Sequence, residues 1–99
     1  RRHRHRQRRR QVFLRHNAMC RDVDVLLAFL PEASMGTAIE MWEAYQHGAA
    51  VITISPMEHN WAVKFLSHEL YADVAAFQAA LESSRLAQRI GEIRGDQRP

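Results

Sequence analysis

Apolar and polar residues are grouped along the chain in blocks whose lengths are those of strands and helices. Residues 23–30 (V-D-V-L-L-A-F-L) and 49–55 (A-A-V-I-T-I-S) are nearly continuous apolar runs, and each stops at a proline, Pro31 or Pro56. A short apolar run bounded in this way predicts a strand covered on both faces, as strands are in parallel sheets. The pattern therefore predicts two buried parallel strands.

A helical pattern separates these two strands. Over residues 37–47 apolar side chains recur at i, i+3, i+4 and i+7, and Gly48 stands where a helix C-cap is expected. We therefore expect a helix whose buried stripe consists of Ala38, Met41, Trp42 and Tyr45.

Three further elements follow the second strand. The pattern predicts a short helix at residues 61–66, a brief strand at residues 70–71 and a last helix capped by Asp73. The buried stripe expected for the last helix is Val74, Phe77, Leu81 and Leu86. Strands that alternate with helices predict an α/β fold, a small parallel sheet sandwiched between helices as in flavodoxin-like and Rossmann-like domains.

Charge divides the chain into a basic segment and a domain. The first ten residues hold seven arginines, so the rest has seven Lys and Arg against eleven Asp and Glu, although the whole chain has a net charge of +3. Like charges at this density repel one another. We therefore predict a disordered basic segment at residues 1–21, an α/β domain at residues 22–90 and a polar tail at residues 91–99.

The basic segment leaves more than one function open. We interpret Arg1–Arg10 as a non-specific polycation, with nucleic-acid association or nuclear import as alternatives. No aromatic residue is interleaved with these arginines, so stacking on bases is not favoured.

The sequence lacks the features that several classes of protein require. The single cysteine, Cys20, forms no internal disulfide and favours a reducing compartment, so we expect the cytoplasm. The six histidines have no recognised ligand spacing, and there is no dinucleotide or P-loop motif, so neither a metal nor a cofactor is expected. No apolar run approaches the ~20 residues of a membrane span, so no membrane partner is expected.

The candidate chemistry follows the first strand. Residues 31–40 (P-E-A-S-M-G-T-A-I-E) lead from that strand into the helix, where open α/β sheets bind ligands. Ser34 is suited to cap this helix, Gly36 lets a ligand approach the backbone, and free N–H groups there favour an anion. Glu40 shares a helix face with Glu43 and His47, and periodicity alone predicts that this face is solvated.

The spacing around Glu40 resembles that of a known family. S-M-G-T-A-I-E (residues 34–40), followed by a helix and then G-A-A-V-I-T-I (residues 48–54), is similar to the nucleoside 2-deoxyribosyltransferases. Their pattern is Asp or Ser, one residue, Gly, three residues and Glu, and residues 22–82 follow the family's order of elements. The resemblance implies that Glu40 attacks C1′ of a deoxynucleoside, displaces the base and passes the sugar to another base or to water.

Two polar residues narrow the class of substrate that the resemblance implies. The transferases tend to have Asp where this chain has Ser34, whereas the related nucleoside 5′-monophosphate N-glycosidases have Ser, which helps to bind phosphate. With Gly36 and Thr37 beside it in the motif, Ser34 favours a phosphorylated nucleoside and hydrolysis. Asn60 is the candidate for the polar residue that a neighbouring subunit contributes in this family. The alternative is that Ser34 and Asn60 simply cap helices.

One unit of the family has no counterpart in this sequence. The family opens with a strand and a small-residue loop that hold the sugar or phosphate, and nothing in residues 1–21 matches them. We therefore expect the first βα unit to be missing and the sheet to expose an edge or a hydrophobic face. Either another segment or chain completes the pocket, which fits a homo-oligomer, or the chain is a catalytically eroded nucleotide-binding or assembly module.

Overall fold

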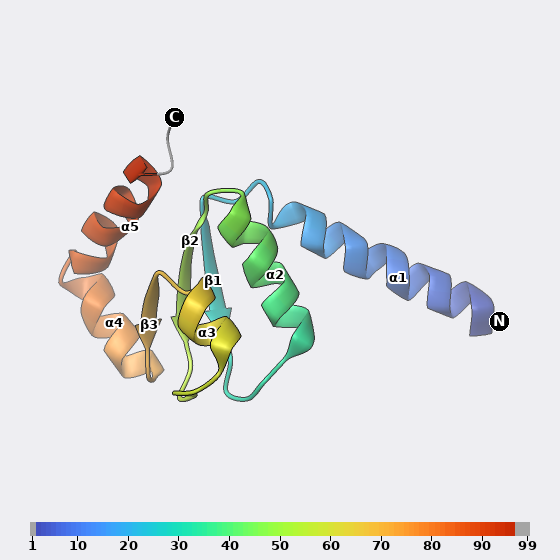
Figure 1. The fold of residues 1–99 in the computed structure, drawn as a ribbon, viewed down its shortest axis with the longest axis horizontal. Coiled ribbons are helices and arrows are strands. Elements are labelled where there is room, and N and C mark those ends of the chain that lie inside the picture. The colour runs from blue at the N-terminus through green and yellow to red at the C-terminus, as the bar shows by residue number, and fades with distance from the viewer. Residues whose placement is uncertain (1, 97–99) are drawn as a thin grey trace.

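The computed structural model describes residues 2–96 and contains a three-stranded parallel sheet flanked by helices (Figure 1). The predicted small α/β architecture is thereby confirmed. Arg1 and residues 97–99, the end of the predicted tail, lie outside the described residues. In chain order the elements are α1 (Arg2–Met19), β1 (Val25–Phe29), α2 (Met35–Gln46), β2 (Ala50–Ile54), α3 (Trp61–Leu66), β3 (Glu69–Tyr71), α4 (Val74–Glu82) and α5 (Arg85–Asp96).

The strands lie in the order β1-β2-β3, and each is parallel to its neighbour. β1 pairs with β2 over its whole length, from Val25 opposite Ala50 to Phe29 opposite Ile54. Two crossovers of the same hand that step in the same direction leave their helices on one face of a sheet. Accordingly α2 and α3 cover one face, while α4 and α5 lie against β3 and β2 on the other (Figure 1).

The core lies on both sides of β2, whose five residues are all buried. On one side, Met41 and Ala44 of α2 and Val63 of α3 pack over the sheet with almost no exposed surface. On the other side, α5 contributes Leu86 and Ile93, which are also buried. A continuous apolar strand is stable only with such cover on both faces, so the sequence pattern of β2 is explained.

β1 is covered on one face only. Its inward residue Ala28 is buried, but Val25, Leu27 and Phe29 alternate with it and are 38%, 51% and 60% exposed. These three side chains share the sheet face on which α5 lies, but α5 covers β2 rather than β1. β1 is also an edge strand, so the predicted exposed edge and exposed hydrophobic face are both present.

The buried stripe of α2 differs from the predicted one. Met41 is buried as expected, but Trp42 and Tyr45 are 51% and 38% exposed, and Ala44 is buried in their place. The aromatic rings lie along the surface instead, where Trp42 stacks on Tyr45 and Tyr45 on His68. The helix ends as predicted, because Gly48 adopts a φ of 88°, which is favourable only for glycine.

The last helix of the prediction is two helices. Asp73 caps α4 as expected, since its Oδ1 accepts a hydrogen bond from the N–H of Ala76 at 2.8 Å. The helix then stops at Ser83, and Ser84 has a φ of 63° that turns the chain into α5. Val74 and Leu81 therefore stay about half exposed, and the predicted stripe is wrong for both. The turn allows α5, rather than α4, to bury its apolar side against β2.

The predicted disorder of residues 1–21 is wrong, because Arg2–Met19 form a helix of 18 residues. Arginine is a good helix former, and the repulsion between exposed like charges is small for each pair, so propensity prevails. Cys20 is buried in the core, which extends the domain beyond its predicted start. At the other end, Ile93 lies within the predicted tail but is buried in α5. No described helix has the length and apolar character to cross a membrane.

His68 supports the start of β3 with its side chain. The ring nitrogen Nδ1 accepts a hydrogen bond from the backbone N–H of Val51 at 2.9 Å. The backbone N–H of His68 donates to the carbonyl of Val51 at 2.8 Å. The acceptor role requires that Nδ1 carry no proton. Burial lowers the pKa of His68, as does the positive charge of Arg89, whereas Glu69 acts in the opposite direction.

We predict that His68 makes the domain less stable in mild acid. Its folded pKa lies below its unfolded value, so the stabilisation is complete above about pH 6.5 and is lost as the pH falls through and below that value. The lost hydrogen bond amounts to about 1 kcal/mol. Denaturant unfolding between pH 8 and pH 5 should show a shallower loss in His68→Asn, whose Oδ1 accepts without titrating. Equal pH profiles for the two proteins would contradict this role.

Candidate functional site

A small hollow lies at the carboxyl ends of β1 and β2, where the sequence predicted a site. It has a volume of about 180 Å³ and brings together Ser34 and Ala38 of the α2 region with Met57 and Asn60 from the loop after β2. Leu30, directly after β1, forms part of its floor. The structure thus brings together Ser34 and Asn60 of the same chain, whereas the resemblance implied an Asn60 from a neighbouring subunit.

Ser34 is the N-cap of α2. Its Oγ accepts a hydrogen bond from the N–H of Thr37 at 3.2 Å, and its carbonyl accepts from the N–H of Ala38. The capping alternative is therefore correct, yet the hydroxyl proton of Ser34 remains available to a ligand. Within the described chain the N–H groups of Met35 and Gly36 also have no partner, and such free groups at a helix start attract anions.

The other residues of the motif have simpler environments. Thr37 is half-buried and contributes its backbone N–H to the cap rather than to the hollow. A Cβ added to Gly36 would lie 4.0 Å from Ser34 Oγ, an ordinary contact, so packing does not require glycine here. Access to the backbone is the remaining advantage of Gly36.

Asn60 is the N-cap of α3. Its Oδ1 accepts a hydrogen bond from the N–H of Val63 at 3.1 Å, as the capping alternative predicted. The amide nitrogen makes no hydrogen bond to any described residue, so its two N–H donors are free at the wall of the hollow.

Glu40 lies apart from this hollow, on the face of α2 that turns toward the end of α1. There it borders a second, shallow hollow of about 250 Å³ with His16, Met19, Cys20 and Val23. The Cys20 thiol donates a weak hydrogen bond to Glu40 Oε2 at 3.9 Å. Burial raises the pKa of Cys20, and the charge of Glu40 and its hydrogen bond raise it further, so this thiol stays protonated.

The charges along this face of α2 are not equivalent. Glu43 forms an ion pair with Arg21 at 2.6 Å and lies 3.9 Å from His47, and the Arg21 hydrogen bond lowers the pKa of Glu43. Glu40 has no cationic partner among the described residues, although it is half-buried. The predicted solvated face is thus partly covered by the segment after α1, and one of its carboxylates is unpaired.

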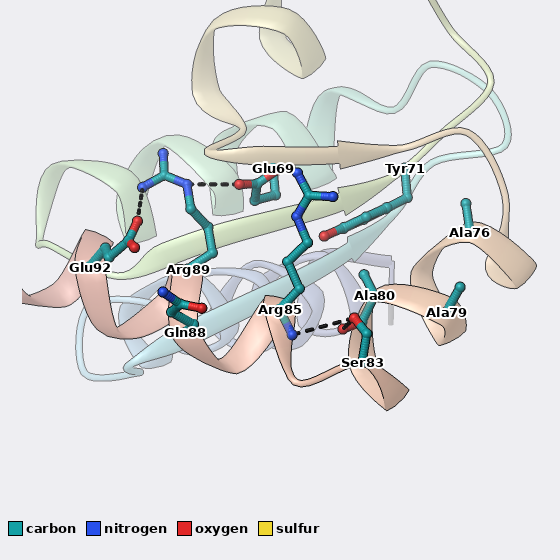
Figure 2. A pocket seen from close by; sticks show the side chains of 10 residues that line it. All are labelled: Glu69, Tyr71, Ala76, Ala79, Ala80, Ser83, Arg85, Gln88, Arg89 and Glu92. Carbon is teal, nitrogen blue, oxygen red and sulfur yellow. Dashed lines mark hydrogen bonds and ion pairs between the residues drawn. The ribbon is translucent and has the colours of Figure 1, made fainter.

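A larger cleft lies elsewhere, between β3 and the pair α4–α5 (Figure 2). Its volume is about 790 Å³. Arg89 joins two carboxylates there, with Nε 2.7 Å from Glu69 and Nη1 3.6 Å from Glu92, while Arg85 extends from α5 toward β3. The residues that line it are Glu69, Tyr71, Ala76, Ala79, Ala80, Ser83, Arg85, Gln88, Arg89 and Glu92.

The pattern of the sequence does not predict this cleft. Its one local signal is a run of small side chains, Ala76, Ala79 and Ala80, which share a side of α4 and leave space beside β3. The turn at Ser84 that closes the cleft has no such signal, because serine seldom adopts positive φ. Among residues 4–95 no three His, Cys, Asp or Glu side chains gather as a metal site requires.

We predict that Ser34 stabilises the domain as a cap. Ser34→Ala removes the acceptor for the Thr37 N–H and should lower the free energy of unfolding by about 1 kcal/mol. Ser34→Asp restores an acceptor and should retain the stability of the parent chain. Denaturant unfolding at neutral pH measures both variants, and a destabilisation of Ser34→Asp as large as that of Ser34→Ala would refute the capping role.

Comparison of the chain with family models, with curated proteins and with solved structures finds no match. The functional interpretation of the two hollows therefore depends on the residues themselves, and the resemblance to the nucleoside 2-deoxyribosyltransferases stays a prediction.

Proposed function

We propose that this domain cleaves the N-glycosidic bond of a nucleoside or nucleoside 5′-monophosphate, or transfers its 2-deoxyribosyl group, with Glu40 as the nucleophile. One observation carries the proposal. Glu40 is a half-buried carboxylate that borders a hollow and makes no ion pair within the described chain. Glu43, on the same face, is occupied by Arg21 and is therefore the weaker candidate.

The position of Glu40 in the fold agrees with the family resemblance. The helix that carries it follows β1 directly, begins at the cap Ser34 and is followed by the buried strand β2. Glu40 lies six residues after the cap, about 9 Å further along the helix axis. This is the order of strand, cap, glutamate and strand on which the resemblance depends.

The proposed reaction needs only a carboxylate and water. A bond forms between Glu40 Oε and C1′ as the C1′–N bond breaks, and the departing base takes the bonding electrons and then a proton from water. Water next attacks C1′ as the C1′–Oε bond breaks, which frees the carboxylate. The proton that this water releases neutralises the hydroxide left when the base was protonated. A second base in place of water gives transfer instead. The carboxylate also stabilises the positive charge that develops on the sugar in the transition state.

The hollow at the start of α2 supports a phosphorylated substrate. The Ser34 hydroxyl, the free N–H groups of Met35 and Gly36 and the Asn60 amide are all hydrogen-bond donors, and no acidic residue lines this hollow. Donors grouped at a helix start fit the oxygens of a phosphate.

One wall of the pocket is missing, and a second chain or a further segment would form it. The edge of β1 has unpaired backbone groups, and Val25, Leu27 and Phe29 offer an uncovered apolar face beside it. An added strand would pair with that edge and cover these side chains. We therefore propose that the active form is a homo-oligomer or is completed by such a segment.

We predict that Glu40→Gln abolishes the release of free base. The variant removes the nucleophile without changing the volume of the side chain, so the rate should fall by about 10³-fold or more. The measurement is chromatography of bases released from a panel of deoxynucleosides and their 5′-monophosphates. Glu43→Gln is the matched control on the same helix face and should retain the activity.

Two outcomes would reject this proposal. Equal base release by Glu40→Gln and the parent chain would exclude Glu40 as the nucleophile. Binding of nucleotides without any release by the parent chain would indicate an eroded binding module instead. Circular dichroism of each variant should first establish that the fold is retained.

We also predict that Ser34 discriminates between phosphorylated and free nucleosides. Ser34→Asp keeps the helix cap but places a negative charge beside the proposed phosphate position. The KM for a nucleoside monophosphate should therefore rise by about tenfold or more, with little change for the free nucleoside. A similar change of KM for both substrates would show that Ser34 does not contact phosphate.

A further inference from the structure

We propose that α1 binds duplex nucleic acid through the phosphate backbone. The helix carries arginines at positions 4, 6, 8, 9, 10 and 15, and their side chains are exposed. None of them forms an ion pair with a described residue, and α1 has no acidic residue of its own. An exposed set of cations without counter-charges is a binding surface for a polyanion.

The arginines lie on opposite sides of α1. At about 100° per residue, Arg4, Arg8 and Arg15 lie along one side of the helix, and Arg6 and Arg10 lie along the other. The major groove of duplex DNA is about 12 Å wide and admits an α-helix between two rows of phosphates. Cations on both sides of α1 therefore fit contacts to both strands.

The charge spacing of the helix also matches that of a duplex. Five arginines between positions 4 and 10 lie along about 9 Å of helix axis, which is roughly one positive charge for every 2 Å. Duplex DNA carries one negative charge for about 1.7 Å of its axis.

The position of α1 leaves this surface accessible. The helix extends away from the sheet (Figure 1). Its main contact with the domain is between the C-terminal end of α1 and α2. The basic half projects away from the sheet, and the side chains of Arg4, Arg6, Arg8, Arg9 and Arg10 are exposed. An approaching duplex would meet the arginines without displacing any other element.

Two other polyanionic or acidic partners fit less well. Four described carboxylates, Glu43, Glu69, Glu92 and Asp24, already pair with arginines of the domain. The other described carboxylates are spread over separate loops and helices, so a second copy offers α1 no row of anions at the charge density of a duplex. A membrane surface needs an apolar stripe along the helix. The apolar residues Val12, Phe13 and Leu14 are consecutive and so surround α1 instead of lining one side.

The test is the salt dependence of duplex binding by the full chain. Fluorescence anisotropy with a labelled DNA duplex of about 20 base pairs should show the affinity falling by about 500-fold between roughly 50 and 200 mM salt, as five neutralised phosphates require. Changing Arg4, Arg6, Arg8, Arg9 and Arg10 to Gln together should remove most of this salt dependence. Lys64→Gln with Arg85→Gln removes two exposed cations of the domain as a matched control and should leave the binding unchanged.

Each other outcome identifies a different partner or none. An RNA duplex in place of DNA shows which nucleic acid binds more tightly, and either result supports the proposal. Equal binding by the five-Gln variant overturns it. Equally tight binding to phosphatidylserine vesicles, or salt-sensitive self-association without duplex binding in sedimentation, would replace the duplex by a membrane or a second copy. Circular dichroism and the thermal midpoint of the five-Gln variant establish that the domain remains folded.

Discussion

A parallel sheet needs cover on both faces, and of the described strands only β2 receives it. The helices α2 and α3 supply one layer, and α5 supplies the other through Leu86 and Ile93. Because α5 lies over β2, it cannot also cover β1, whose outward side chains remain exposed. The compact core, the position of the strand-end hollow and the open side next to β1 all follow from this single constraint.

The parts of the fold that the sequence predicts are those that local chemistry decides. Continuous apolar runs locate β1 and β2, and side-chain caps at Ser34, Asn60 and Asp73 locate three helix starts. The parts that it does not predict depend on contacts between distant residues. The turn at Ser84 uses a conformation that serine rarely adopts, and it is retained because it brings α5 onto β2.

The same distinction applies to the candidate site. That Ser34 and Asn60 meet follows from parallel strands, whose carboxyl ends lie at the same edge of the sheet. The surroundings of Glu40 can be predicted only with the path of the chain before β1, because Cys20 and α1 cover that side of α2. Periodicity alone could not reveal this, since it describes a helix without its neighbours. The cleft beside β3 depends on the Ser84 turn and was missed for the same reason.

The distribution of ion pairs separates the charges that the fold uses from those that it leaves free. Arg21, Arg89 and Arg94 each hold a carboxylate of a different element and so join the segment after α1, β3 and α5 to the rest of the domain. Glu40 and the arginines of α1 at positions 4–15 have no such partner within the described chain. An exposed arginine without a partner costs the fold little, because water solvates it. A half-buried carboxylate is different, since it loses part of its hydration without gaining a counter-charge. No ion pair with a described residue compensates the partial burial of Glu40, and the proposed role as nucleophile depends on this observation.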